Sequence, residues 1–125
     1  METPRPDGTG PADDLLTVTR QSAGDGDVSV RARGEVDAST SPVLEDALTA
    51  ELAGGPRRLT LDLDSVTFFS SAGISTLVTV QGRCADRGTR FVVLAPRRVR
   101  RVIGLAGIDR VVTVLDSGAP GPGGT

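Results

Sequence analysis

The chain of 125 residues contains no histidine, tryptophan or tyrosine, and all 14 of its basic residues are arginine. Without histidine or lysine, a serine hydroxyl has no neighbouring base of the usual kind, so triad-type nucleophilic catalysis is excluded. With three phenylalanines as its only aromatic residues, the chain also lacks the platforms on which nucleic-acid bases stack. We therefore expect a protein that is not an enzyme, needs no cofactor and binds no nucleic acid.

The chain also lacks long apolar runs and pairs of cysteines. No apolar run reaches the roughly 20 residues that a membrane-spanning helix needs, and the opening METPRPDGTGPADD lacks the basic and apolar regions of a signal peptide. The single cysteine, Cys84, cannot form an internal disulfide, which agrees with a reducing compartment. We expect Cys84 to be a small core residue, and the protein to be cytoplasmic and without membrane contact.

The composition is that of one globular domain, with 38% hydrophobic and 24% charged residues and a net charge of −2. Both ends are rich in glycine, proline and aspartate and can bury little apolar surface. The sequence therefore predicts a single domain at 14–116, between disordered tails at 1–13 and 117–125.

Apolar and polar residues alternate in several short segments, which is typical of strands. The predicted strands are 15–20, 28–34, 57–66, 90–95 and 111–115. The first two are separated by the turn-forming SAGDGD and should form a hairpin. In 57–66, alternate leucines indicate a strand packed on one face, whereas the continuous apolar run RFVVLA at 90–95 indicates a strand covered on both faces.

Helical spacing of apolar residues alternates with these strands. The first helix should have Ser41 as its N-cap and Pro42 as its first residue. The second should run from Ala72 to about Gly88, and the third should begin at 97 and stop at Gly107. The order ββαβαβαβ predicts an α/β domain with a mixed sheet, in which an antiparallel hairpin is followed by parallel strands joined by helical crossovers.

The adjacent serines Ser70 and Ser71 fall between the strand that ends near Phe69 and the following helix. Ligands and modifications collect at the carboxyl ends of strands in such folds, and a helix N-terminus attracts negative charge. A phosphate attached here would be well accommodated. The simpler interpretation is that one of the serines caps the helix. Gly73, without a side chain, would let another backbone or a bulky partner approach the first helical turn.

Carboxylates offer a further kind of site. Asp37, Asp62 and Asp64 would face the strand ends, where clustered oxygen ligands can hold magnesium. Carboxylates on strand faces are more often solvated, so we expect no metal site.

Three segments together resemble the STAS domain of bacterial anti-sigma factor antagonists. They are RGEVDASTSPVLEDAL, RRLTLDLDSVTFFSSAGISTLV and GTRFVVLAPRRVRRVIGLAGIDRVVTV, in the order and spacing of that family. The family's strand-to-helix junction reads roughly Asp, Ser, Ser or Ala, Gly, Leu, and its first serine accepts phosphate from a partner that is both kinase and anti-sigma factor. The resemblance implies that Ser71 is the phosphate acceptor, followed by Ala72, Gly73 and Ile74.

The resemblance also implies a partner-binding surface. It would comprise Asp37, Ser70, Ser71, Ala72, Gly73 and Ile74, with Asp37 alternatively serving only as a turn residue. The implied partner is an anti-sigma factor of the serine-kinase type, which the unphosphorylated protein binds so that the sigma factor is released. A phosphatase would reset the cycle, and the oligomeric state stays open.

The chain departs from the family pattern at Ser70, where the family has aspartate. Two consequences are open: the kinase fails to engage Ser71, or Ser70 becomes a second acceptor. The departure also supports an alternative function, a STAS scaffold or transporter-associated module that binds partners without phosphorylation.

Four arginines, at 97, 98, 100 and 101, flank the apolar stripe of the third predicted helix. We interpret them as the solvated face of an amphipathic helix. A basic patch that faces a partner, or a nucleic-acid contact, is the alternative interpretation.

Overall fold

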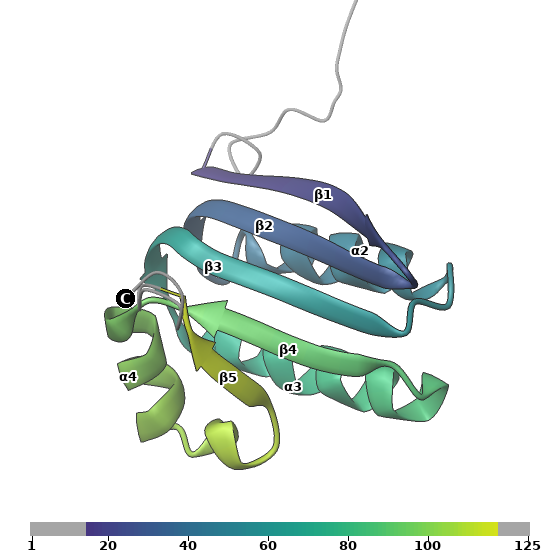
Figure 1. Cartoon of the computed structure of the whole chain (residues 1–125). Coiled ribbons are helices and arrows are strands. Elements are labelled where there is room, and N and C mark those ends of the chain that lie inside the picture. Colours follow the sequence, from purple (N-terminus) through teal and green to yellow (C-terminus); the bar gives the residue numbers. More distant parts are fainter. Residues whose placement is uncertain (1–14, 118–125) are drawn as a thin grey trace, which may run out of the picture.

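A computed structural model describes residues 15–117, which form a five-stranded mixed sheet packed against helices (Figure 1). In chain order the elements are β1 (Leu16–Gly24), β2 (Asp27–Val36), α2 (Ser41–Leu52), β3 (Arg58–Phe69), α3 (Ser71–Arg87), β4 (Arg90–Ala95), α4 (Arg97–Leu105), the 3-10 helix η2 (Ile108–Arg110) and β5 (Thr113–Asp116). The predicted order ββαβαβαβ is confirmed. The predicted tails lie outside the described residues, except for Ser117, whose amide donates to the carbonyl of Ala95 at 3.0 Å.

The opening hairpin is antiparallel, as predicted, and turns tightly at Asp25 and Gly26. Both residues have positive φ, 54° and 82°, which is the conformation of the two-residue hairpin turn that Asp-Gly sequences favour. Gly24 pairs with Asp27 across the turn.

The other strand pairs are parallel, and the strands lie in the sheet in the order of the chain, from β1 to β5. Figure 1 shows α2 and α3 behind the sheet, and α4 beside β5 at the end of the sheet where the parallel strands finish. The sheet face toward the viewer lies open in front of β1, β2 and β3.

The core lies between the sheet and α2 and α3. On β3, Leu59, Leu61 and Leu63 are fully buried, while Asp64 on the other face is exposed; packing on one face was predicted. Cover on both faces of β4 was predicted as well, but holds only in part. Val92 is 8% exposed, whereas Leu94 is half-buried.

Several predicted element boundaries were wrong by one to four residues, and the largest difference is at the end of β1, which continues to Gly24 instead of ending at position 20. The N-cap of α2 is Thr40 and not Ser41, because Ser41 is buried as the first helical residue and donates its amide to the carbonyl of Asp37. The last strand begins at Thr113 because the amide of Val112 is bonded to Ile108 in the preceding turn. The predicted stop at Gly107 is confirmed by its φ of 77°.

The carboxyl ends of β2, β3 and β4 share one edge of the sheet. The pairing of β3 with β4 ends at Asp62 and Leu94, whereas β3 stays paired with β2 as far as Phe69 and Val36. The last seven residues of β3, 63–69, therefore extend beyond β4 and carry the chain into α3. We call this segment the β3 extension.

Candidate functional site

The two serines identified from the sequence lie where β3 passes into α3. The amide of Ser70 donates to the carbonyl of Val36 at 2.9 Å, which continues the β2 to β3 ladder by one more bond. This bond places the end of β2, and the loop that begins at Asp37, directly beside the start of α3.

Ser70 caps α3. Its backbone is extended, its Oγ accepts a hydrogen bond from the amide of Ala72 at 3.2 Å, and its carbonyl accepts from Gly73 and Ile74. Amides in the first turn of a helix have no partner within the helix, so these bonds satisfy groups that would otherwise need water. The Ser70 side chain is half-buried and engaged in its own backbone.

Ser71 is the first residue of α3 and is exposed. Within the described residues its hydroxyl makes no hydrogen bond, so nothing there holds it in one orientation. The first turn of α3 contains no acidic side chain, and the partial positive charge of the helix N-terminus favours an anion at this position. Of the two serines, Ser71 therefore presents the more accessible hydroxyl.

Gly73 is buried rather than exposed. A Cβ at this position would lie 2.7 Å from two ring atoms of Phe69 and 2.9 Å from Cγ1 of Val36, which is closer than packed carbon atoms approach. The absent side chain thus admits two residues of the same chain to the first turn of α3. The next residue, Ile74, is half-buried and packs against the core.

Asp37 orders the loop between β2 and α2. Its Oδ1 accepts hydrogen bonds from the amide and hydroxyl of Ser39 and from the amide of Thr40, at 2.8 to 3.1 Å. The bond from the Ser39 hydroxyl is the largest of the effects that lower the pKa of Asp37, followed by the Thr40 amide. The structure thus gives Asp37 the turn role that the sequence left as one of two alternatives.

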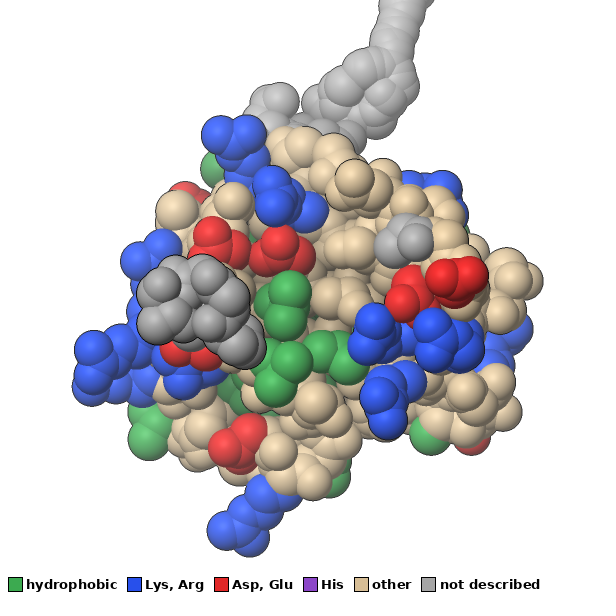
Figure 2. All heavy atoms as spheres, viewed as in Figure 1, with side chains coloured by type: hydrophobic (Ala, Val, Ile, Leu, Met, Phe, Trp, Pro, Cys, Tyr) green, Lys and Arg blue, Asp and Glu red, His purple; other side chains and the backbone are tan. Residues whose placement is uncertain are grey.

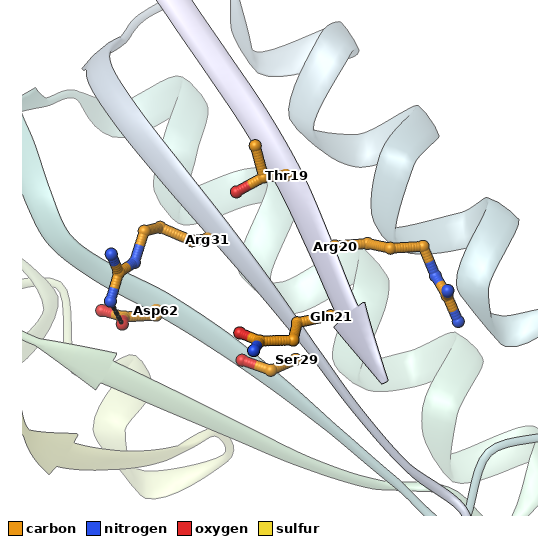
Figure 3. A pocket seen from close by; sticks show the side chains of 6 residues that line it. All are labelled: Thr19, Arg20, Gln21, Ser29, Arg31 and Asp62. Atoms are coloured by element: carbon orange, nitrogen blue, oxygen red, sulfur yellow. Dashed lines mark hydrogen bonds and ion pairs between the residues drawn. The ribbon is translucent and has the colours of Figure 1, made fainter. Parts of the chain in front are cut away.

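A shallow hollow of about 430 Å³ lies elsewhere, on the open face of the sheet. Figure 3 shows Thr19, Gln21, Ser29, Arg31 and Asp62 on this face, and Arg20 pointing away from it. Arg31 and Asp62 are paired at 3.3 Å. The hollow lies over the middle of β1, β2 and β3, so it is separate from the edge that carries Ser71.

The three aspartates that were weighed as magnesium ligands, Asp37, Asp62 and Asp64, do not form a metal site. In the part of the chain that the structure describes, no group of three or more acidic, histidine or cysteine side chains could hold a metal ion. Asp62 faces Arg31, and Asp64 accepts from the hydroxyl of Ser117 at 2.9 Å. Cys84 is fully buried, and burial raises its pKa to about 11, so its thiol stays protonated near neutral pH.

Sequence reasoning missed Phe68, whose ring is 52% exposed next to this site. The sequence carried only part of the signal. Consecutive strand residues point to opposite faces, so one of the adjacent rings had to face outward, but alternation does not say which; in the structure Phe69 is the buried one. The register of β2 against β3 shifts between Gly34 and Glu35, so that Glu35 pairs with Phe68. This shift determines which of the two rings faces outward.

The fold and this junction define a STAS domain. A family model described as "Mlab, STAS domain" matches residues 19–115. The anti-sigma-F factor antagonist RsfB of Mycobacterium tuberculosis is 33% identical over 107 residues, which cover 85% of this chain and 86% of RsfB. The chain belongs to the STAS-domain family of anti-sigma factor antagonists.

Solved structures agree with this assignment. An anti-sigma factor antagonist from Mycobacterium paratuberculosis superposes with a TM-score of 0.75 at 30% identity, covering 86% of this chain and 89% of that one. The antagonist SpoIIAA shares the fold, with 15% identity in each of two forms. Its unphosphorylated form has a TM-score of 0.67 and covers 78% and 87% of the two chains, and its phosphorylated form has a TM-score of 0.61 and covers 78% and 90%.

Across residues 15–117, no helix combines the length and the apolar character that crossing a membrane requires.

The packing of Gly73 can be tested against a second glycine in the same helix. Gly82 is exposed with open space around its Cα, so Gly82→Ala should stabilise the protein by about 0.5–1 kcal/mol. Gly73→Ala should instead destabilise it by about 1–3 kcal/mol, because the methyl group overpacks Phe69 and Val36. Urea denaturation of both variants checks this, and equal effects would contradict the assigned contact.

The capping role of Ser70 predicts a difference between the two serines. Ser70→Ala should lower the free energy of unfolding by about 1 kcal/mol, whereas Ser71→Ala should change it by less than about 0.5 kcal/mol. The same denaturation experiment measures both. A larger loss for Ser71→Ala than for Ser70→Ala would mean that the cap is misassigned.

Proposed function

We propose that this protein is a binding protein, an anti-sigma factor antagonist that is switched off by phosphorylation of Ser71. In its unphosphorylated form it binds an anti-sigma factor, and the sigma factor held by that anti-sigma factor is released. The partner is an anti-sigma factor of the serine-kinase type, which supplies the ATP. A phosphatase restores the unmodified serine.

The exposed hydroxyl of Ser71 carries this proposal. It lies at the N-terminus of α3, next to a capping residue and without a hydrogen bond among residues 15–117. A kinase can therefore reach it without unfolding the helix. Relatives named as anti-sigma-F factor antagonists, matching more than four-fifths of the chain, support the same function.

Phosphorylation would act through charge. A phosphoserine carries about −1.5 to −2 charges at neutral pH. The helix N-terminus tolerates that charge while the site faces water. Inside a closed protein interface the phosphate must be desolvated or paired, which is costly unless the partner supplies matching cations. Binding therefore weakens while the fold stays unchanged.

The partner surface centres on Ser71 and includes the exposed parts of its neighbours. Three neighbours are half-buried and add the exposed parts of their side chains to this surface: Ser70, Ala72 and Ile74. Gly73 shapes the surface from beneath, and Asp37 positions the adjoining loop. We place the cycle in the cytoplasm, where the sigma factor acts.

Ser70 supports a second candidate function, a STAS scaffold that binds its partner without phosphorylation. The side chain that replaces the family aspartate is a neutral helix cap, so a kinase that requires a carboxylate there would not engage Ser71.

Variants at Ser71 distinguish the two functions. We expect Ser71→Ala to bind the anti-sigma factor as tightly as the wild type, and Ser71→Glu to bind at least about tenfold more weakly, a loss of about 1.4 kcal/mol. Calorimetry on purified proteins measures both affinities. The wild type is measured before and after incubation with the anti-sigma factor and ATP, so that its unmodified and phosphorylated forms can be compared with the two variants. The helix dipole favours a carboxylate at this position, so Ser71→Glu should remain folded.

Ser75→Glu serves as the matched control, because Ser75 is exposed one turn further along α3. Equal affinities for Ser71→Ala and Ser71→Glu would disprove the switch and leave the scaffold function.

A further inference from the structure

The outer face of α4 carries positive charge that the described residues do not neutralise. α4 buries Val99 and Ile103 and exposes Arg97, Arg98 and Arg101. Arg100 is paired with Asp116 at 2.9 Å, but within residues 15–117 the three exposed arginines have no carboxylate partner. Figure 2 shows basic side chains gathered at the left of the molecule, where Figure 1 has α4.

One of these arginines, Arg98, contacts the segment that leads to the acceptor serine. Nη2 of Arg98 donates to the carbonyl of Val66 at 3.4 Å, and Val66 is in the middle of the β3 extension. The same extension ends at Phe69 and continues directly into Ser70 and Ser71. The start of α4 thus contacts the strand segment that ends at the Ser71 site. A hollow of about 510 Å³, lined by Pro96, Arg97, Arg98 and Arg101, opens beside it.

Phe68 adds an apolar group to the same surface. It lies in the β3 extension, two residues after Val66 and two before Ser70. Its ring is 52% exposed, whereas Phe69 and Phe91 are 5% and 3% exposed. Aromatic residues and arginine are the side chains most enriched at the energetic centres of protein interfaces.

A stable complex needs a larger contact area than the turn around Ser71 offers. A specific complex buries about 800 Å² on each partner, from about 20 to 30 residues. The turn around Ser71 cannot supply this area, because Gly73 is buried and Ala72 and Ile74 are half-buried. An interface centred on Ser71 must therefore cover neighbouring elements.

We propose that Phe68 and the exposed arginines of α4 complete the docking surface for the anti-sigma factor. The proposal rests on the proposed function and specifies the chemistry of the partner. The anti-sigma factor presents an apolar recess for the ring of Phe68, and carboxylates at its rim pair with Arg97 and Arg101. Arg98 holds α4 against the β3 extension.

This surface gives the phosphate a second effect. Before modification the surface is positively charged and attracts the acidic rim of the partner. A phosphate on Ser71 adds about −1.5 to −2 charges to the same edge of the sheet. The phosphate offsets much of the arginine charge, so it slows association as well as obstructing the closed interface.

The first test removes two charges at each of two places. Arg97→Gln/Arg101→Gln removes them from the proposed surface, and Arg87→Gln/Arg90→Gln removes them from the opposite end of the sheet, where α3 ends and β4 begins. Each kinase-type anti-sigma factor of the same bacterium is purified and used as the probe, and association and dissociation rates are measured at low and high salt. None of the four arginines has a carboxylate partner within the described residues. Arg87 donates to the carbonyl of Leu52 at 3.3 Å, a single bond whose loss leaves the core intact, so the variants should remain folded.

We expect the first pair to weaken binding about tenfold at low salt, mainly through a slower association rate, and to lose this effect as salt screens the charges. The second pair should change affinity less than about twofold. Phe68→Ser should raise the dissociation rate at least about tenfold.

The result that overturns this inference is wild-type affinity in both Arg97→Gln/Arg101→Gln and Phe68→Ser. If Ser71→Glu still abolishes binding in that case, the proposed function stands and only the extended surface is wrong. If no anti-sigma factor binds the wild type, both fail. Self-association or nucleic-acid binding that is lost in the arginine variant, with unchanged affinity for the anti-sigma factor, would assign the surface to another occupant and also overturn the inference.

Discussion

The hydrogen bond from the amide of Ser70 to the carbonyl of Val36, at 2.9 Å, is the constraint on which the site depends. It joins the ends of β2 and β3 one residue beyond their last paired positions, and so fixes where α3 starts. Gly73 can then pack on Phe69 and Val36, which leaves Ser71 as the first exposed residue of the helix. The core supports this arrangement, because the fully buried leucines of β3 hold the strand that ends at the site.

Neighbouring residues at the junction have different roles: some hold the backbone in place, and one exposes its hydroxyl. The side chains of Ser70 and Asp37 accept hydrogen bonds from backbone amides, at the start of α3 and just before α2. The hydroxyl of Ser71 makes no hydrogen bond within residues 15–117, so it is accessible in the way that a modification site requires. Because the groups around Ser71 are already hydrogen-bonded, the proposed phosphate would leave the fold unchanged and would act through the binding of a partner. This is a local change of charge with a distant consequence.

Much of the fold could be predicted from periodicity. The hairpin, the one-sided packing of β3, the helix stops at Gly88 and Gly107 and the order of strands and helices along the chain all follow from alternation and turn residues. The errors have local causes that a single sequence does not show. Ser41 resembles an N-cap, but Thr40 takes that position and its hydroxyl donates to the carbonyl of Glu35. The outward ring of Phe68 depends on an irregularity in the register of β2 against β3, which alternation alone cannot place.

The position of the strand-to-helix junction could be predicted from the sequence, but the contacts that its residues make could not. Two serines before a helical pattern indicated a cap or an acceptor; only the coordinates assign Ser70 to the cap. Gly73 was expected to make room for another backbone or for a partner, and in the structure it makes room for the side chains of Phe69 and Val36. The arginines of α4 were interpreted as a solvated face, and their place beside the β3 extension becomes visible only when Arg98 is seen to reach Val66.

Site-resolved phosphorylation tests the central claim most directly. The wild type, Ser70→Ala and Ser71→Ala are recovered from their native cells under growth and stress conditions and analysed by mass spectrometry. The account predicts phosphate on Ser71 in the wild type and in Ser70→Ala, and none in Ser71→Ala. Phosphate on Ser70 instead, or on neither serine under any condition, would contradict it.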